Sequence, residues 1–436
     1  MSHWESLLKK TRQVLGSLPD RRTGDNCKYS MQDIGLGAFS VFFTQSPSFL
    51  SHQKTMEQTK GRSNAQSLFQ IEKIPCDNHI RQTLDPVAPD KLFALFDEVF
   101  QTLRKKDVLE SYRAVHDTIP IALDGTWYNS SQKVHCEHCS CMEHKNGEKT
   151  YFHSAITPVI VAPGQPHALS LRPEFITPQD GHTKQDCEIA AAKRWLEKNA
   201  GLYSGLKATL LGDDLYAHQP FCRQTLLYDF DFIYVCKPDS HKTLYDWVNL
   251  LAVGKDLHLL KGRVKNGAKW EHYTYGYANQ VPLAEGEDAL KVNWCELTIT
   301  DAEGKVLYRN AFITDFKITH QNVEAIVATA RSRWKIENEN NNVLKTKGYH
   351  LEHNFGHGKN HLASFLAALN ILAFLYHTFL SFTDEHYRLI RSVLPTRKTF
   401  FDDLRALTRY MLFASWEALM DFMMAGLEIG PYAKKA

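Results

Sequence analysis

The segment RSRWKIENENNNVLK, residues 331–345, holds the side chains best suited to chemistry, because an acid stands there among several basic residues. The spacing predicts a helix on which Arg333 lies one turn before Glu337. A carboxylate in basic surroundings suits a metal ion that acts on a phosphate backbone. Glu337 is therefore a candidate catalytic residue.

Two aspartates fit the same chemistry. Asp124 ends the apolar run IPIALDGTWY and Asp213 ends KATLLGDDLY, and both runs predict buried strands that deliver a carboxylate at their C-terminal ends. Three carboxylates, together with substrate phosphate oxygens, suit Mg²⁺, with Mn²⁺ as a substitute. Two such ions about 3.5–4 Å apart stabilise both the attacking and the leaving oxygen of a displacement at phosphorus. The predicted metal ligands are thus Asp124, Asp213 and Glu337.

Each of two members of this set has a rival beside it. Asp214 competes with Asp213, because adjacent residues on a strand point to opposite sides. Glu339 competes with Glu337, but residues two positions apart on a helix differ by about 200°, so only one can face the metals. Arg333 lies on the same face as Glu337 and favours it. We prefer Asp213 and Glu337.

The order Asp, Asp, Glu on strand, strand and helix resembles the DDE transposases of bacterial insertion sequences, which have a ribonuclease H-like core. Their helix signature combines Tyr, Arg, Glu and Lys, and Arg333 stands four residues before the Glu as the signature requires. Ala330 occupies the tyrosine position, Trp334 is the nearest aromatic residue, and Lys345 lies one residue beyond the lysine position. An aromatic residue, Tyr216, also follows Asp213 by three positions, as in the family's second motif.

The resemblance implies a function and a division of roles. Asp124 would bridge two Mg²⁺ ions, with Asp213 on one ion and Glu337 on the other, for DNA cleavage and strand transfer. The partners would be double-stranded DNA, from transposon ends and target, and a second copy of the chain in a synaptic homodimer. The residues expected to contact DNA are Arg331, Arg333, Trp334, Lys237 and Lys345. The alternatives are a ribonuclease H-like nuclease without strand transfer and a DNA-binding protein that has lost catalysis.

The expected fold class is α/β, with a ribonuclease H-like core, an inserted antiparallel β subdomain and flanking helical regions. Apolar periodicity and turn residues set the boundaries. The predicted regions are a helical DNA-binding module at 1–110, the first part of the core at 115–245, the β insertion at 246–315, the second part of the core with the Glu helix at 316–383, and a C-terminal helical region at 384–436.

Composition agrees with a globular protein that binds nucleic acid through local clusters of charge. The chain has 436 residues, 43% of them hydrophobic, and a net charge of only +2, so it is no polycation. Its nine cysteines suit a reducing cytoplasm better than a disulfide framework. The apolar stretch at 362–380 contains Asn370 and His377. We therefore expect a buried core helix there, no membrane span, and a cytoplasmic protein.

The segment HCEHCSCMEH places Cys136 and Cys139 in a C-x-x-C pair, a spacing that suits tetrahedral Zn²⁺. One such pair is half of a zinc site, and a redox dithiol or two free thiols fit it equally. Histidines at 350, 353, 357 and 361 also suggest a metal, but Gly356 and Gly358 interrupt the helix that would align them. For these histidines we expect phosphate contact or ordinary packing.

Four asparagines, at positions 338 and 340–342, give the Glu helix an uncommon polar character. Asparagine is a poor helix former, so its repeated use indicates another role. We expect these side chains either to contact phosphates or bases or to form a solvated face.

Overall fold

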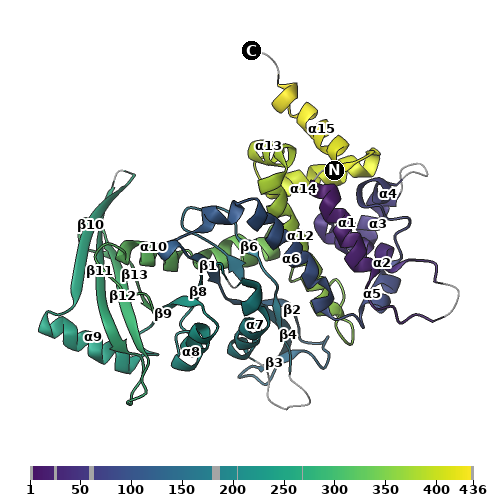
Figure 1. Cartoon of the computed structure of the whole chain (residues 1–436). Helices are drawn as coiled ribbons and strands as arrows, with labels where there is room; N and C mark the ends of the chain where they lie inside the picture. Colours follow the sequence, from purple (N-terminus) through teal and green to yellow (C-terminus); the bar gives the residue numbers. More distant parts are fainter. Residues whose placement is uncertain are drawn as a thin grey trace.

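The computed structural model describes residues 3–23, 27–57, 63–178, 187–203, 205–267 and 269–433. It confirms a mixed α/β protein with a mixed sheet. Helices from both ends of the chain gather at one end of the molecule, and a long sheet extends away from them (Figure 1).

The central sheet contains nine strands in the order β10-β11-β12-β13-β9-β8-β1-β5-β6. β1 is parallel to β8 and β8 to β9, whereas the other neighbours are antiparallel. The strands are β1 (Ile119–Ala122), β5 (Val159–Ile160), β6 (Leu169–Ser170), β8 (Ala208–Gly212), β9 (Asp231–Val235), β10 (His258–Asn266), β11 (Lys269–Pro282), β12 (Lys291–Thr300) and β13 (Val306–Thr314).

A second, smaller sheet continues the strands at one edge of the first. β2 (Gly125–Ser131) follows β1 directly, β4 (Lys149–Ile156) leads into β5, and β7 (Glu174–Ile176) follows β6. In this sheet β4 pairs with β2, with β7 and with β3 (Ser140–Glu143). The chain therefore passes from one sheet to the other at Asp124, between β1 and β2.

The inserted segment is antiparallel, as expected, but it does not form a sheet of its own. β10 to β13 pair in sequence order, and β13 pairs with β9, so the insertion lengthens the central sheet. Helix α9 (Lys242–Gly254) covers β11 (Figure 1). The edge strand β10 is almost fully exposed and carries Lys261, Arg263 and Lys265, charges that discourage pairing with another chain.

Helices precede, interrupt and follow the strands along the chain. The N-terminal helices are α1 (His3–Gly16), α2 (Met31–Phe43), α3 (Phe49–Glu57), α4 (Asn64–Phe69), α5 (Asp77–Leu84) and α6 (Phe93–Lys105). Within the sheet region lie α7 (Glu188–Tyr203), α8 (Gln219–Leu227), α10 (Val323–Arg331) and α11 (Asn342–Thr346). The C-terminal helices are α12 (Leu362–Thr383), α13 (Glu385–Val393), α14 (Arg397–Tyr410) and α15 (Trp416–Gly426). The segment KQDCEIAAAKRWLEKNA, residues 184–200, predicts a helix by its sequence; α7 lies there, and residues 184–186 are outside the described ranges.

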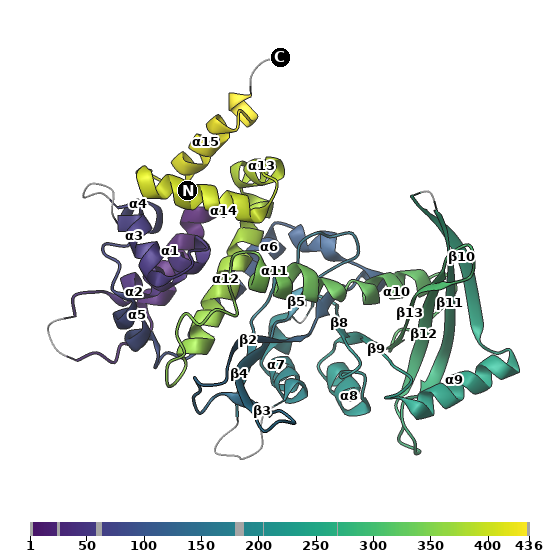
Figure 2. The same ribbon diagram turned by 180° about the vertical axis from the view of Figure 1, so that it is seen from behind.

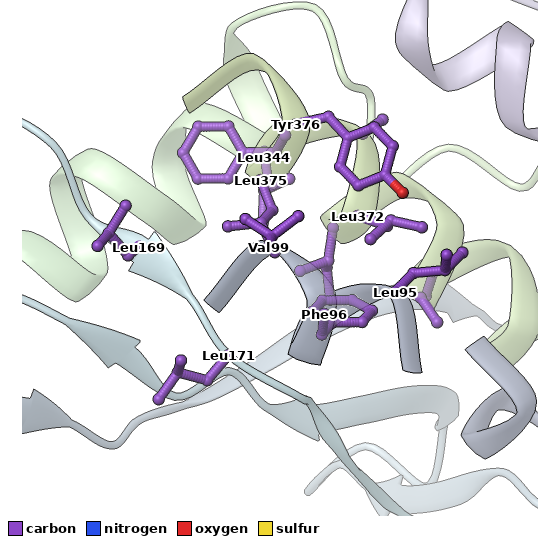
Figure 3. Packing of buried hydrophobic residues seen from close by; sticks show 14 of the residues in the cluster. Leu95, Phe96, Val99, Leu169, Leu171, Leu344, Leu372, Leu375 and Tyr376 are labelled. Carbon is purple, nitrogen blue, oxygen red and sulfur yellow. The ribbon is translucent and has the colours of Figure 1, made fainter. Parts of the chain in front are cut away.

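The N-terminal helices share their hydrophobic core with the rest of the chain. α12 lies beside the N-terminal helices (Figure 2) and packs against α2, α6 and α1. One hydrophobic core joins these helices to α13–α15 and to the sheet. Figure 3 shows the centre of this core, where side chains of α6 and α12 meet those of β6 and α11. The labelled residues are Leu95, Phe96, Val99, Leu169, Leu171, Leu344, Leu372, Leu375 and Tyr376.

Helix α12 is long and apolar enough, by length and composition, to cross a membrane, yet 89% of its most apolar window is buried inside the protein. Its polar residues have partners there. Asn370 Nδ2 donates to the carbonyl of Tyr349 at 2.8 Å, and His377 Nδ1 lies 2.6 Å from the Tyr349 hydroxyl. The expectation of a buried core helix is confirmed.

Candidate active site

Asp124 and Asp213 follow neighbouring parallel strands at equivalent positions. In the β1–β8 pair, Ala122 is opposite Leu211, and each aspartate comes two residues later. The Leu123 amide still donates to the Leu211 carbonyl at 2.8 Å, so the two chains remain side by side up to the acids. Parallel strands end at the same edge of a sheet, and this edge carries both carboxylates.

Asp124 lies in a strongly acidic and largely dehydrated place. Burial is the main cause that raises its pKa, to about 7, and the charges of Glu188, Glu337 and Asp213 raise it further, whereas Arg333 opposes them. The interaction with both other predicted acids places Asp124, Asp213 and Glu337 in one electrostatic neighbourhood. A cation bound there would relieve the repulsion among them.

Glu188, the first residue of α7, is a fourth acid that the sequence analysis missed. Burial raises its pKa, and nearby Asp213 adds to the shift. Its Oε1 accepts a hydrogen bond of 2.6 Å from the buried Tyr216 hydroxyl. A Cβ on Gly125 would lie 2.3 Å from Glu188 Oε2, so only glycine leaves room for this carboxylate. No motif marks Glu188, because the start of a helix is an ordinary place for an acid.

The geometry separates Asp213 from Asp214. Asp213 Oδ1 accepts from the Leu215 amide at 2.9 Å, and its charge acts on Asp124 and Glu188. Asp214 is engaged with the loop after β9, where its carboxylate accepts from the Lys237 amide at 2.6 Å and the Ser240 hydroxyl at 2.5 Å, and lies 3.3 Å from His241 Nε2. Asp214 therefore orders a loop, and Asp213 belongs with the other acids.

Glu337 lies in a π-helical segment, η4 (Ile336–Asn341), between α10 and α11 (Figure 2). Such segments are uncommon and occur frequently at functional sites. Its side chain is 54% exposed and is 3.0 Å from the Arg333 guanidinium. The charge of Glu339, in contrast, acts on Lys335 and Arg397. Glu337 is thus the acid of this segment that influences Asp124.

Two of the four asparagines fasten this segment to the strands. Asn341 Oδ1 accepts from the Thr157 hydroxyl at 2.8 Å, and Asn341 Nδ2 donates to Asp124 Oδ2 at 3.3 Å. Asn340 Oδ1 accepts from the Ser170 hydroxyl at 2.8 Å. Both asparagines are buried, so the expectation of phosphate contact or a solvated face is wrong for them. They connect the Glu337 segment to Asp124 and to β6.

The residues expected to contact DNA lie in separate places. Arg333 faces the acids, as described above. Arg331 and Trp334 line a hollow of ≈ 440 Å³, and the Arg331 guanidinium lies over the Tyr308 ring. Lys345 is paired with Glu352 at 3.0 Å, and Lys237 is exposed in the loop after β9.

A Cys/His cluster that could bind a metal ion lies beyond the far end of β2. It contains Cys136, Cys139, His153 and His357, whose ligand atoms all lie within 4.8 Å of one another. His153 is on β4, and His357 lies between α11 and α12. His357, for which phosphate contact or ordinary packing is expected, thus lies within reach of the C-x-x-C pair. Spacing along the chain reveals only the Cys136–Cys139 pair, because His153 lies on another strand and His357 lies more than 200 residues away.

Among the described residues, no other group of three or more such ligands is as tight. The acids are therefore more loosely arranged than the Cys/His cluster, with Glu337 turned toward Arg333. The sequence matches no protein-family model, and no curated protein matches it.

Proposed function

We propose that the chain is a DDE-type transposase, which binds the terminal inverted repeats of a mobile element, cleaves the DNA and joins the freed 3′-hydroxyls to a target. The partners would be double-stranded DNA and a second copy of the chain, because two ends must be held together. A cytoplasmic location belongs to the same proposal.

The order of strands supports a ribonuclease H-like core. β6, β5 and β1 form an antiparallel meander, and β8 and β9 continue the sheet in parallel with β1. Three antiparallel strands followed by two parallel ones is the order expected for that core. The insertion follows the last of these strands, and the Glu337 segment follows the insertion.

The observation that carries the proposal is the meeting of Asp124 and Asp213 at one sheet edge, within electrostatic reach of Glu337. Carboxylates raise one another's pKa only when their charges are close and poorly screened, and such sites are candidates for function. The three acids also come from the element types and in the order that the resemblance requires.

The donor set fits hard divalent cations. Asp124, Asp213 and Glu337 supply only carboxylate oxygens, the ligands that Mg²⁺ prefers, and Glu188 adds a nearby negative charge. When bound, Mg²⁺ would activate the attacking oxygen and stabilise the leaving oxygen at phosphorus. Asn341 orients Asp124, and Arg333 offsets part of the acidic charge. The softer thiolate and imidazole donors of the Cys/His cluster suit Zn²⁺, which we propose as its ion.

The test is strand transfer by the purified full-length protein. A pre-nicked duplex that copies the terminal repeats flanking the gene is incubated with target plasmid and Mg²⁺, and joined products are counted. Asp124→Asn, Asp213→Asn and Glu337→Gln should each abolish joining and cleavage while retaining end binding, because binding depends on basic side chains spread along the DNA.

Glu339→Gln is the matched control and should retain joining, since its charge acts on Lys335 and Arg397. Cleavage without any joined product would favour the nuclease alternative. Wild-type joining by all three variants would refute the proposal.

A further inference from the structure

The Cys/His cluster has the dimensions of a tetrahedral zinc site. The two sulfurs of Cys136 and Cys139 are 3.9 Å apart. His153 Nε2 lies 3.5 Å from Cys136 Sγ and 3.4 Å from Cys139 Sγ, and His357 Nε2 lies 3.5 Å from Cys139 Sγ. For bonds of about 2.3 Å to sulfur and about 2.0–2.1 Å to nitrogen, a tetrahedron has edges of about 3.8 Å between sulfurs and about 3.5 Å between sulfur and nitrogen.

The surroundings of the cluster also suit a bound ion. The Cys136 amide points at Cys139 Sγ, at 3.4 Å, as a donor to a thiolate would. Asn129 lies opposite His153 in the β2–β4 pair, and its amide group is 3.2 Å from His357 Nδ1. With His357 binding through Nε2, its Nδ1 carries the proton, and a 180° turn of the Asn129 amide, which exchanges Nδ2 for Oδ1, would place the acceptor that fixes the ring.

The four ligands join parts of the chain that are far apart in sequence. The cysteines lie in the turn after β2, the strand that begins next to Asp124, and His153 lies on β4. His357 belongs to the segment that follows the Glu337 helix, which is also held by α5 through a 2.8 Å hydrogen bond from Arg81 Nε to the Phe355 carbonyl. An ion at the cluster would therefore connect the chain beyond Asp124 to the chain beyond Glu337.

We propose that Cys136, Cys139, His153 and His357 form a closed structural Zn²⁺ site that clips the β2–β4 hairpin to the segment between α11 and α12. Four protein ligands leave no open position, so the ion has no catalytic role. The clip joins the hairpin that follows Asp124 to the segment that follows the Glu337 helix. It depends only on its own ligands and not on the proposed transposition chemistry.

The first measurement is metal content of the full-length protein by elemental analysis. We expect about one zinc ion per chain, lost in Cys139→Ser and in His357→Ala after dialysis against a chelator that the wild type withstands. Cys141→Ser and His138→Ala are matched controls from the same turn, and both should retain zinc because neither residue belongs to the cluster. Protein that neither contains zinc nor takes up added Zn²⁺, or that carries a Cys136–Cys139 disulfide, would overturn the proposal.

The second measurement tests the clip itself, and it does not need activity. Trypsin can cut after Lys359, two residues from His357, and after Lys265 on the distant strand β10. Removal of zinc, or His357→Ala, should accelerate the cut at Lys359 and leave the cut at Lys265 unchanged. Zinc that is retained in His357→Ala, with unchanged cleavage at Lys359, would show a site confined to the hairpin and would refute the clip.

Discussion

Burial and repulsion by neighbouring acids both disfavour the ionised carboxylate of Asp124, whereas its proposed role as a metal ligand needs that charge. In protein without metal, its pKa of about 7 means that the folded state holds a proton which the unfolded chain, with an ordinary aspartate, loses near pH 4. The contribution of Asp124 to the free energy of unfolding is fully present below the pKa of an ordinary aspartate. This contribution is lost as the pH rises through about 7.

This titration predicts that Asp124→Asn stabilises the metal-free protein, and more so at about pH 8 than at about pH 5. The stabilisation by Asp124→Asn should be about 1–3 kcal/mol larger at the higher pH than at the lower one. This difference is smaller than the full pKa shift implies, because solvent reaches part of the site and screens the charges. Thermal unfolding in the presence of a chelator measures it. Added Mg²⁺ should stabilise the wild type at about pH 8 but not the variant. Equal gains at both pH values would contradict the raised pKa.

Glu188 gives a second prediction at this scale, because Gly125 leaves the space that its carboxylate occupies. Gly125→Ala should displace Glu188 and reduce joining activity about as much as Glu188→Gln, by roughly 10-fold or more. The double variant should be no worse than either single one, since both changes remove the same carboxylate. Gly262→Ala on β10, where a Cβ meets open space, serves as the control. Additive losses of joining activity in the double variant would mean that Gly125 and Glu188 act independently.

Among the elements, the π-helical segment η4 fixes the position of Glu337 relative to Asp124 through hydrogen bonds. Asn341 holds both the Thr157 hydroxyl and Asp124, and its oxygen also accepts from Asn340 Nδ2 at 2.9 Å. These bonds explain why asparagine, a poor helix former, is used here: the segment needs buried amides more than helical propensity. The position of Glu337 relative to Asp124 thus depends on this small network.

We therefore expect Asn341→Ala to reduce the free energy of unfolding by about 1–3 kcal/mol, because it leaves buried polar partners unsatisfied. Asn338→Ala, on the exposed side of the same segment, should change it by no more than about 0.5 kcal/mol. Urea unfolding of the two variants provides the comparison. Similar stabilities would mean that the network contributes little.

The sequence predicted those strands and site residues whose pattern lies within one short segment of the chain. The strands before Asp124 and Asp213 were predictable because short apolar runs ended at each acid, and the alternation of β11–β13 predicted antiparallel pairing. Glu188, His153 and Asn341 could not be recognised, because their roles arise only when distant segments fold together. The joining of the insertion to β9 is likewise a tertiary event that local periodicity does not encode.

At the scale of the whole molecule, the shared core of N-terminal and C-terminal helices predicts that residues 1–110 do not fold alone. The isolated fragment lacks α12, which covers the apolar faces of α2 and α6. Circular dichroism should show no cooperative thermal transition for the fragment, whereas the full chain should unfold cooperatively. A cooperative transition in the fragment would restore the idea of an independent N-terminal module.

The same arrangement has a consequence for synthesis on the ribosome. α6 ends at Lys105, but α12 begins only at Leu362, so the N-terminal helices emerge long before the helix that covers them. At a synthesis rate of roughly 5–20 residues per second, the apolar faces of these helices remain uncovered for some tens of seconds. During that interval the nascent chain presents surfaces that chaperones recognise. The assembly of all four acids is also postponed until most of the polypeptide has been made.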